Sequence, residues 1–181
     1  MRNGNTIVLV IGRGSRSFMG WIWWKKDASR RADFARALEI DACQIVALVS
    51  VEPLGEYRRE MLTSSGGSSG IGEMVFNEVF GELLSAKQLR KDEETAEALG
   101  IELPRVGWLV VWPTCVEVWS AEKIYGPPLQ LCARWSLSSI SNAESTRRGF
   151  HQRLKLTVDG AVLVLVTKDR DEALRVSAHF S

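Results

Sequence analysis

The feature that most constrains the fold of this chain is a pair of short apolar runs separated by only two residues, Asp159 and Gly160. Asp-Gly between strand-like runs favours a type I′ turn, because both central residues of that turn need a positive φ. A two-residue turn also fixes the register of the flanking strands, 154–158 and 161–166. We therefore expect an antiparallel hairpin with one apolar face on the core. The register pairs these apolar residues: Val158 with Ala161, Leu156 with Leu163, and Leu154 with Leu165.

The opposite face of the hairpin differs between its two strands. It pairs a polar residue with a valine each time: Thr157 with Val162, Lys155 with Val164, and Arg153 with Val166. The second strand is thus apolar on both faces, which is typical of a strand that is covered on both sides. We expect residues 162–166 to lie deep in the sheet or beneath a covering element.

Other runs that are rich in β-branched and aromatic residues predict further strands. They are 44–51, 106–112, 115–119, 129–135 and 137–144. The run at 44–51 ends before Pro53, and it can serve as the first strand of the sheet. A helical insertion would then separate it from the second strand.

Two segments of the N-terminal half have the periodicity of helices. One begins at Asp27 or Ser29 and runs to about Asp41. The stronger one covers 71–87, and the charged run 87–97 that follows is either an exposed helix or a linker.

The C-terminus predicts one more helix. Asp169 at its start and Glu172 three residues later form the pattern of a capping box. One helical face then carries Ala173, Val176, Ser177 and Phe180. A terminal helix that closes an antiparallel sheet is an α+β arrangement.

This order of short strands, a basic turn, an Asp-Gly hairpin and a closing helix resembles the bacterial pleckstrin-homology-like (GRAM-like) domains. It also resembles small actinobacterial proteins with a helical N-terminal half before such a domain. The residues that carry the resemblance are 108–119 as a first hairpin, 134–137 leading into Ile140, and 154–166 with its Asp-Gly turn. The resemblance implies a strongly bent antiparallel sheet, a partly open barrel, capped by the C-terminal helix. It implies binding rather than catalysis, and it supplies no ligand.

The resemblance and the composition divide the chain into parts. We expect residues 1–18 to be an N-terminal extension, with Met19 as an alternative natural start. Residues 19–104 are expected to be an extension of helices and a strand, with a Gly/Ser-rich linker at 63–70. Residues 105–181 are expected to form the pleckstrin-homology-like domain.

An aromatic and basic cluster near the N-terminus is a candidate contact for anionic lipid. It consists of Trp21, Trp23, Trp24, Lys25 and Lys26. Tryptophan favours membrane interfaces, and adjacent lysines attract anionic head groups. The alternative, which we favour, is that the tryptophans pack on the sheet and the lysines are solvated.

A second candidate anion contact is the basic turn expected at 146–149, with Arg147 and Arg148. Basic loops bind phosphates in some pleckstrin-homology-like domains, although here the loop lies late in the order of strands. A solvated hairpin end is the simpler interpretation, and we favour it.

The helix at 71–87 carries a broad apolar stripe that is a candidate protein interface. Its members are Ile71, Val75, Val79, Phe80 and Leu83. The stripe can pack on the chain's own sheet, which is the simpler interpretation, or on a partner such as a second copy.

The sequence contains no recognisable catalytic or metal-binding motif. Its two histidines and three cysteines have no metal-ligand spacing. A dinucleotide-binding loop after Gly12 would need glycine where Ser17 stands. The net charge of +1 gives no basic field for nucleic acid. We therefore expect no enzyme activity, no cofactor, no metal and no nucleic acid.

These patterns predict a non-enzymatic bacterial protein-interaction or scaffold module that self-associates through the 71–84 helix face. The odd number of cysteines, without a secretory signal, fits a reducing cytoplasm. The first alternative is a peripheral protein that binds anionic lipid at the inner face of the membrane. The second alternative is an enzyme of uncharacterised activity.

Overall fold

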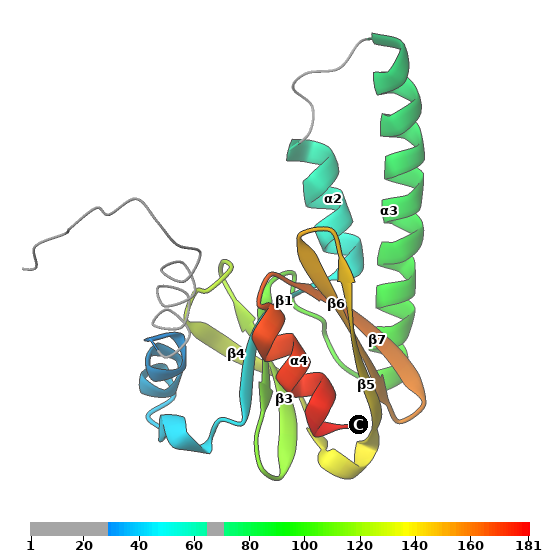
Figure 1. The fold of residues 1–181 in the computed structure, drawn as a ribbon. Helices are drawn as coiled ribbons and strands as arrows, with labels where there is room; N and C mark the ends of the chain where they lie inside the picture. Colours follow the sequence, from blue (N-terminus) through cyan, green and yellow to red (C-terminus); the bar gives the residue numbers. More distant parts are fainter. Residues whose placement is uncertain (1–28, 65–70) are drawn as a thin grey trace, which may run out of the picture.

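The computed structural model of the chain describes the backbone of residues 29–64 and 71–181 and the side chains of 29–61 and 83–181. Within these residues the fold is α+β, with a seven-stranded antiparallel sheet and four α-helices, the last of them at the C-terminus (Figure 1). The strands are β1 (Ala47–Pro53), β2 (Gly107–Val111), β3 (Cys115–Ala121), β4 (Pro128–Ser136), β5 (Ile140–Arg148), β6 (His151–Val158) and β7 (Ala161–Thr167). The helices are 29–37, α2 (Leu54–Ser64), α3 (Ile71–Leu99) and α4 (Arg170–His179), with short 3-10 helices η1 (Ala42–Gln44) and η2 (Leu137–Ser139).

β1 is the strand that joins the two halves of the sheet. The strand order is β4-β3-β2-β1-β7-β6-β5. Residues 47–51 of β1 pair with β2, whereas Glu52 and Pro53 pair with β7. β4 and β5 are the two edges and do not pair with each other, so the sheet is open. The strand predicted at 44–51 is the first strand of the sheet, and a helical insertion separates it from the second, as expected. Its bounds differ from the prediction, because Gln44 belongs to η1 and the strand continues to Pro53, which pairs with β7.

The β6–β7 hairpin has the predicted register and turn. Asp159 and Gly160 have φ angles of 46° and 84°, and both are positive as a type I′ turn requires. The predicted core face is buried except at Ala161, which is partly exposed next to the turn. β7 lies between β1 and β6 with α3 against it. Val162 is an exception to the expected depth of this strand, since 49% of it is exposed.

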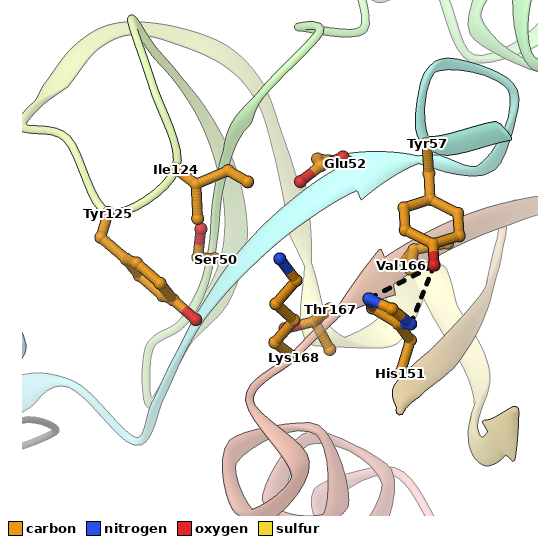
Figure 2. Close-up of a pocket in the computed structure, with 9 residues that line it drawn as sticks. All are labelled: Ser50, Glu52, Tyr57, Ile124, Tyr125, His151, Val166, Thr167 and Lys168. Atoms are coloured by element: carbon orange, nitrogen blue, oxygen red, sulfur yellow. Dashed lines mark hydrogen bonds between the residues drawn. The ribbon is translucent and has the colours of Figure 1, made fainter. Parts of the chain in front are cut away.

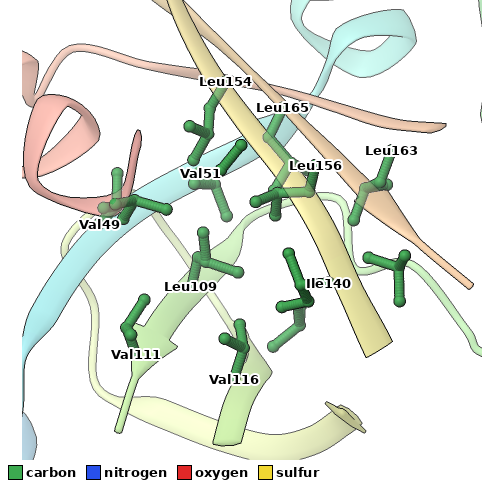
Figure 3. Packing of buried hydrophobic residues seen from close by; sticks show 14 of the residues in the cluster. Val49, Val51, Leu109, Val111, Val116, Ile140, Leu154, Leu156, Leu163 and Leu165 are labelled. Carbon is green, nitrogen blue, oxygen red and sulfur yellow. The ribbon is translucent and has the colours of Figure 1, made fainter. Parts of the chain in front are cut away.

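The main core gathers apolar side chains from both halves of the sheet. Figure 3 shows valines, leucines and an isoleucine from five strands and from the start of β5 meeting side by side. Val176 of α4 belongs to this core, and Ala173 beside it is also fully buried. Ser177 Oγ donates to the backbone oxygen of Ala143 at 2.8 Å. The predicted apolar face of the C-terminal helix is therefore confirmed.

Helix 29–37 packs on side chains that β1 and β2 present to the other face of the sheet. Phe34 contacts Trp108 edge to face, with ring centroids 5.8 Å apart, and both lie in a second core with Leu48 and Val110. Neighbouring residues in a strand point to opposite faces, so β1 and β2 supply side chains to both cores.

The helix predicted to run to about Asp41 is shorter than expected. It ends at residue 37, and Glu39 then has a positive φ of 55°. The Asp41 carboxylate accepts from the backbone N–H of Cys43 and so caps η1 instead. An Asp side chain that bonds the backbone two residues ahead competes with helix continuation.

α2 and α3 form the helical insertion between β1 and β2, and in Figure 1 they extend past the sheet. The charged run after 87 is helical as far as Leu99, and Gly100 then ends α3 with a φ of 64°. A Cβ on Gly55 would lie 2.8 Å from the backbone of Leu89, so glycine allows the two helices to approach. Of the predicted linker, 63–64 belong to α2 and 65–70 lie outside the described residues.

The predicted capping box at the start of α4 is wrong. Asp169 is the N-cap residue, but its side chain makes no capping hydrogen bond. Asp169 instead accepts from Arg30 at 2.7 Å, and Glu172 accepts from Arg31 at 2.7 Å. We call these four residues the acid–arginine clasp.

The clasp forms because β1 has unpaired N–H groups where β7 leaves the sheet. The Leu48 N–H donates to Glu172 at 3.0 Å, and the Ser50 N–H donates to Asp169 at 3.3 Å. A buried N–H without an acceptor costs free energy, and the two carboxylates supply the acceptors that β7 does not. The clasp thus ties helix 29–37, β1 and α4 together.

Candidate functional site

The β5–β6 turn presents two arginines and a phenylalanine at one end of the sheet. β5 ends with Arg147 and Arg148, Gly149 and Phe150 form the turn, and β6 begins at His151. Gly149 has a φ of 61° and Phe150 has no positive φ, which is the pattern of a type II′ turn. The turn expected at 146–149 therefore lies at 149–150, and the arginines are at the end of the strand.

Phe150 is the most exposed large apolar side chain among the residues whose side chains are described, at 95%. Arg147 and Arg148 directly before it are exposed as well. Transfer of a phenylalanine side chain from water into an apolar environment is favourable by about 1.5–3 kcal/mol. An apolar ring beside positive charges is suited to the boundary between head groups and acyl chains.

Basic side chains from other elements lie near this turn. Arg58 comes from α2, Arg153 from β6, and Lys168 follows β7. Burial, and then the positive charges of Arg58 and Arg148, lower the pKa of Arg153. Like charges affect a pKa in this way only at short range, so segments far apart in the sequence bring their cations to one end of the sheet.

Tyr57 and His151 join α2 to the first residue of β6 (Figure 2). The Tyr57 hydroxyl lies 2.8 Å from Nδ1 of His151, and the ring centroids are 4.7 Å apart. Burial, and then the charge of Lys168, lower the pKa of His151 from its usual 6.5, so the imidazole is neutral at pH 7. Burial also raises the pKa of Tyr57, so its hydroxyl keeps its proton. The base of the turn is thus fixed to α2 through two neutral rings.

A small pocket lies beside this pair, lined in part by Glu52, Tyr125 and Lys168 (Figure 2). Its volume is about 10 Å³, which is room for about one water molecule. Burial, and then the charge of Glu60, raise the pKa of Glu52, while Lys168 opposes this effect. Burial raises the pKa of Tyr125 to about 12. The pocket is too small for an organic substrate.

Of the residues predicted to contact anions, Arg147 and Arg148 are consecutive exposed residues at the end of β5, directly before the turn. Trp21, Trp23, Trp24, Lys25 and Lys26 lie outside the described residues. The predicted interface residues Ile71, Val75, Val79 and Phe80 lie on α3, but their side chains are outside the described part. Leu83, the last of that set, is 68% exposed.

Sequence reasoning did not identify Phe150, His151, Tyr57 and Arg58 as parts of this site. The signal for Phe150 was present, because it follows the glycine of a basic turn. No local signal joins Tyr57 to His151, since the two residues are 94 positions apart. Their contact depends on how the insertion packs against the sheet.

The described side chains form no catalytic or metal-binding cluster that we recognise. Within them, no group of at least three His, Cys, Asp or Glu residues could hold a metal ion. Cys132 Sγ donates to the backbone oxygen of Gln130 and His151 bonds Tyr57, so this thiol and this imidazole are not paired with each other as a nucleophile and base would be.

None of the helices in the described part of the chain is long and apolar enough to cross a membrane. A comparison with protein-family models and one with curated proteins both found no match for the chain.

Proposed function

We propose that this chain is a non-enzymatic binding module with a pleckstrin-homology-like fold, and that it attaches to anionic lipid surfaces through the β5–β6 turn. The observation that carries the proposal is Phe150, fully in water on a tight turn directly after Arg147 and Arg148. Two features support the fold: β1 is shared by both halves of the sheet, and α4 closes the core.

The energetics fit a weak, reversible attachment. Each arginine near an anionic membrane contributes about 1 kcal/mol, and burial of Phe150 contributes about 1.5–3 kcal/mol. Arg58 and Lys168 add positive charge near the turn. No acidic residue lies within 146–151, so the turn itself carries no opposing charge.

Co-sedimentation with vesicles tests this function. The parent should bind vesicles that contain phosphatidylglycerol at low salt, and it should be released at high salt because exposed charges are screened. It should not bind vesicles of phosphatidylcholine alone. Arg147→Glu/Arg148→Glu should lower the affinity at least tenfold, and Phe150→Ser should lower it about tenfold.

The matched control is Arg36→Glu/Arg90→Glu. It makes the same change in net charge on helix 29–37 and α3, at two exposed residues that each take part in a surface ion pair. Such pairs contribute little to stability. Equal loss of binding in the control and the turn variant would assign binding to overall charge, and a parent that never sediments with anionic vesicles would refute the function.

A second candidate function is self-association through the α2–α3 insertion. Met61, Leu83 and Leu84 are 51%, 68% and 50% exposed on these helices. The insertion extends past the sheet in Figure 1, so its surface is accessible to a partner. Several exposed apolar side chains on one such element are typical of an interaction surface.

Leu83→Glu/Leu84→Glu should lower the native mass measured by light scattering, while the circular dichroism spectrum stays that of the folded parent. Lys91→Glu, at an exposed position further along α3, introduces the same charge change and should leave the mass unchanged. A parent that is monomeric over the whole concentration range would exclude self-association.

A further inference from the structure

His151 is a titratable residue at the base of the β5–β6 turn, at the start of β6. It follows Phe150 in the chain and pairs directly with Arg148 across the hairpin. It is partly buried at the base of the turn. Because it is next to Phe150 in the chain, it lies close to any surface that Phe150 and the arginines contact. The chain has two histidines, and the other, His179, is exposed near the end of α4.

The groups around His151 come from every element that packs near it. They are Glu52 on β1, Tyr57 and Arg58 on α2, Tyr125 before β4, Arg148 on β5, Arg153 on β6, and Lys168 after β7. Glu56 and Glu60 on α2 also act on Glu52. With these two acids included, four cations face three carboxylates, and Lys168 acts directly on the ring. Away from a membrane, these surroundings favour the neutral imidazole.

We propose that attachment through the β5–β6 turn is proton-linked: His151 takes up a proton when the turn meets an anionic surface, and acid therefore strengthens the attachment. The inference rests on the proposed function of the turn. Burial and then the charge of Lys168 keep the ring neutral. Lipid phosphates would offset the charge of Lys168 and would place negative charge near the ring, and both effects favour the imidazolium. Linkage is reciprocal, so a surface that favours the imidazolium is itself bound more tightly at low pH.

The contact with Tyr57 is compatible with both protonation states. A tyrosine hydroxyl can donate to an unprotonated ring nitrogen, and it can accept from a protonated one. The turn thus stays joined to α2 while its charge changes. The imidazolium adds one positive charge beside Arg148, where it faces the same surface.

The experiment measures the dissociation constant for phosphatidylglycerol vesicles between pH 7.5 and pH 5.5, where the lipid phosphodiester stays ionised. The parent should bind about fivefold more tightly at pH 5.5, the effect of one added charge at the surface. His151→Gln should make the ratio of the two constants close to one. His179→Gln, the matched control, should keep the ratio of the parent.

Glu52 is the other group whose titration could strengthen binding on acidification, so Glu52→Gln is measured as well. It should keep the ratio of the parent. Three results would each overturn the inference. They are binding by Glu52→Gln that no longer depends on pH, binding by His151→Gln that depends on pH as strongly as in the parent, and binding by the parent that does not depend on pH. A parent that fails to bind at pH 7.5 and low salt would refute the proposed function itself, so the two failures are distinguishable.

A direct measurement covers the case in which His151→Gln does not fold. The ring protons of His151 in the parent are followed by NMR through a pH titration, with and without micelles of a short-chain phosphatidylglycerol. The midpoint should move to higher pH with micelles, while that of His179 moves less. Equal movement of both midpoints would overturn the inference.

Discussion

At the residue scale, Glu52 is a buried acid that makes the stability of this fold depend on pH. It is 8% exposed on β1, at the point where this strand begins to pair with β7. Burial, and then the negative charge of Glu60, raise its pKa above the usual 4.5, and Lys168 only partly offsets this. A carboxylate in such surroundings costs free energy when it ionises.

The sign of the effect follows from linkage. Because the pKa of Glu52 is higher in the folded state, its favourable contribution is complete below pH 4.5 and is lost as the pH rises through the folded-state pKa. Glu52→Gln should therefore raise Tm at pH 7 by a few degrees. For a chain of this size, a change of about 1 kcal/mol in the free energy of unfolding shifts Tm by about 2–4 °C.

Differential scanning calorimetry at pH 7 and pH 4 checks this expectation. The increase in Tm of Glu52→Gln over the parent should be present at pH 7 and small at pH 4, where the Glu52 carboxyl of the parent is protonated. Glu93→Gln, an exposed carboxylate on α3, should leave Tm close to that of the parent at both values. A variant that is less stable than the parent at pH 7 would show that the Glu52 carboxylate is stabilising.

At the scale of elements, the acid–arginine clasp decides how helix 29–37 and α4 are attached to β1. Arg31 is 22% exposed and Glu172 6% exposed at their side chains, so this ion pair is largely shielded from water. Glu172 also accepts from the Leu48 N–H and from Arg175. Removal of this carboxylate takes away the acceptor of the Arg31 guanidinium and of the Leu48 N–H. This lowers the free energy of unfolding far more than the loss of a surface ion pair does.

Glu172→Ala should lower the free energy of unfolding by about 3 kcal/mol, the cost of breaking a buried ion pair. Asp171→Ala removes the neighbouring acid of the same helical turn, which is exposed, and should cost less than about 1 kcal/mol. Urea denaturation of the two variants beside the parent gives both values. Similar small losses in both would mean that these acids act only through the helix dipole.

At the scale of the whole molecule, β1 determines how the parts are arranged. It pairs with β2 over 47–51 and with β7 at Glu52 and Pro53, so one strand holds both halves of the sheet. The α2–α3 insertion leaves from its end, and the clasp binds its free N–H groups. Changes at β1 therefore affect the core, the insertion and the candidate site together.

The sequence by itself determined what depends on neighbours in the chain. Asp159-Gly160 fixed a turn, and the turn fixed the register of β6 and β7, because two residues with positive φ allow few other connections. The stripes of α3 and α4 indicated helices for the same local reason, the period of the backbone. The predicted capping box did not form, because Arg30 and Arg31 bind the carboxylates of Asp169 and Glu172.

Only the tertiary structure decided which distant groups meet. Asp169 bonds Arg30 across 139 positions, and Tyr57 reaches His151 across 94. These contacts follow from the departure of β7 from β1 and from the packing of the insertion, which no window of sequence contains. The physical reason is that a buried polar group needs a hydrogen-bond partner. Which partners are near it is decided only once the sheet has formed.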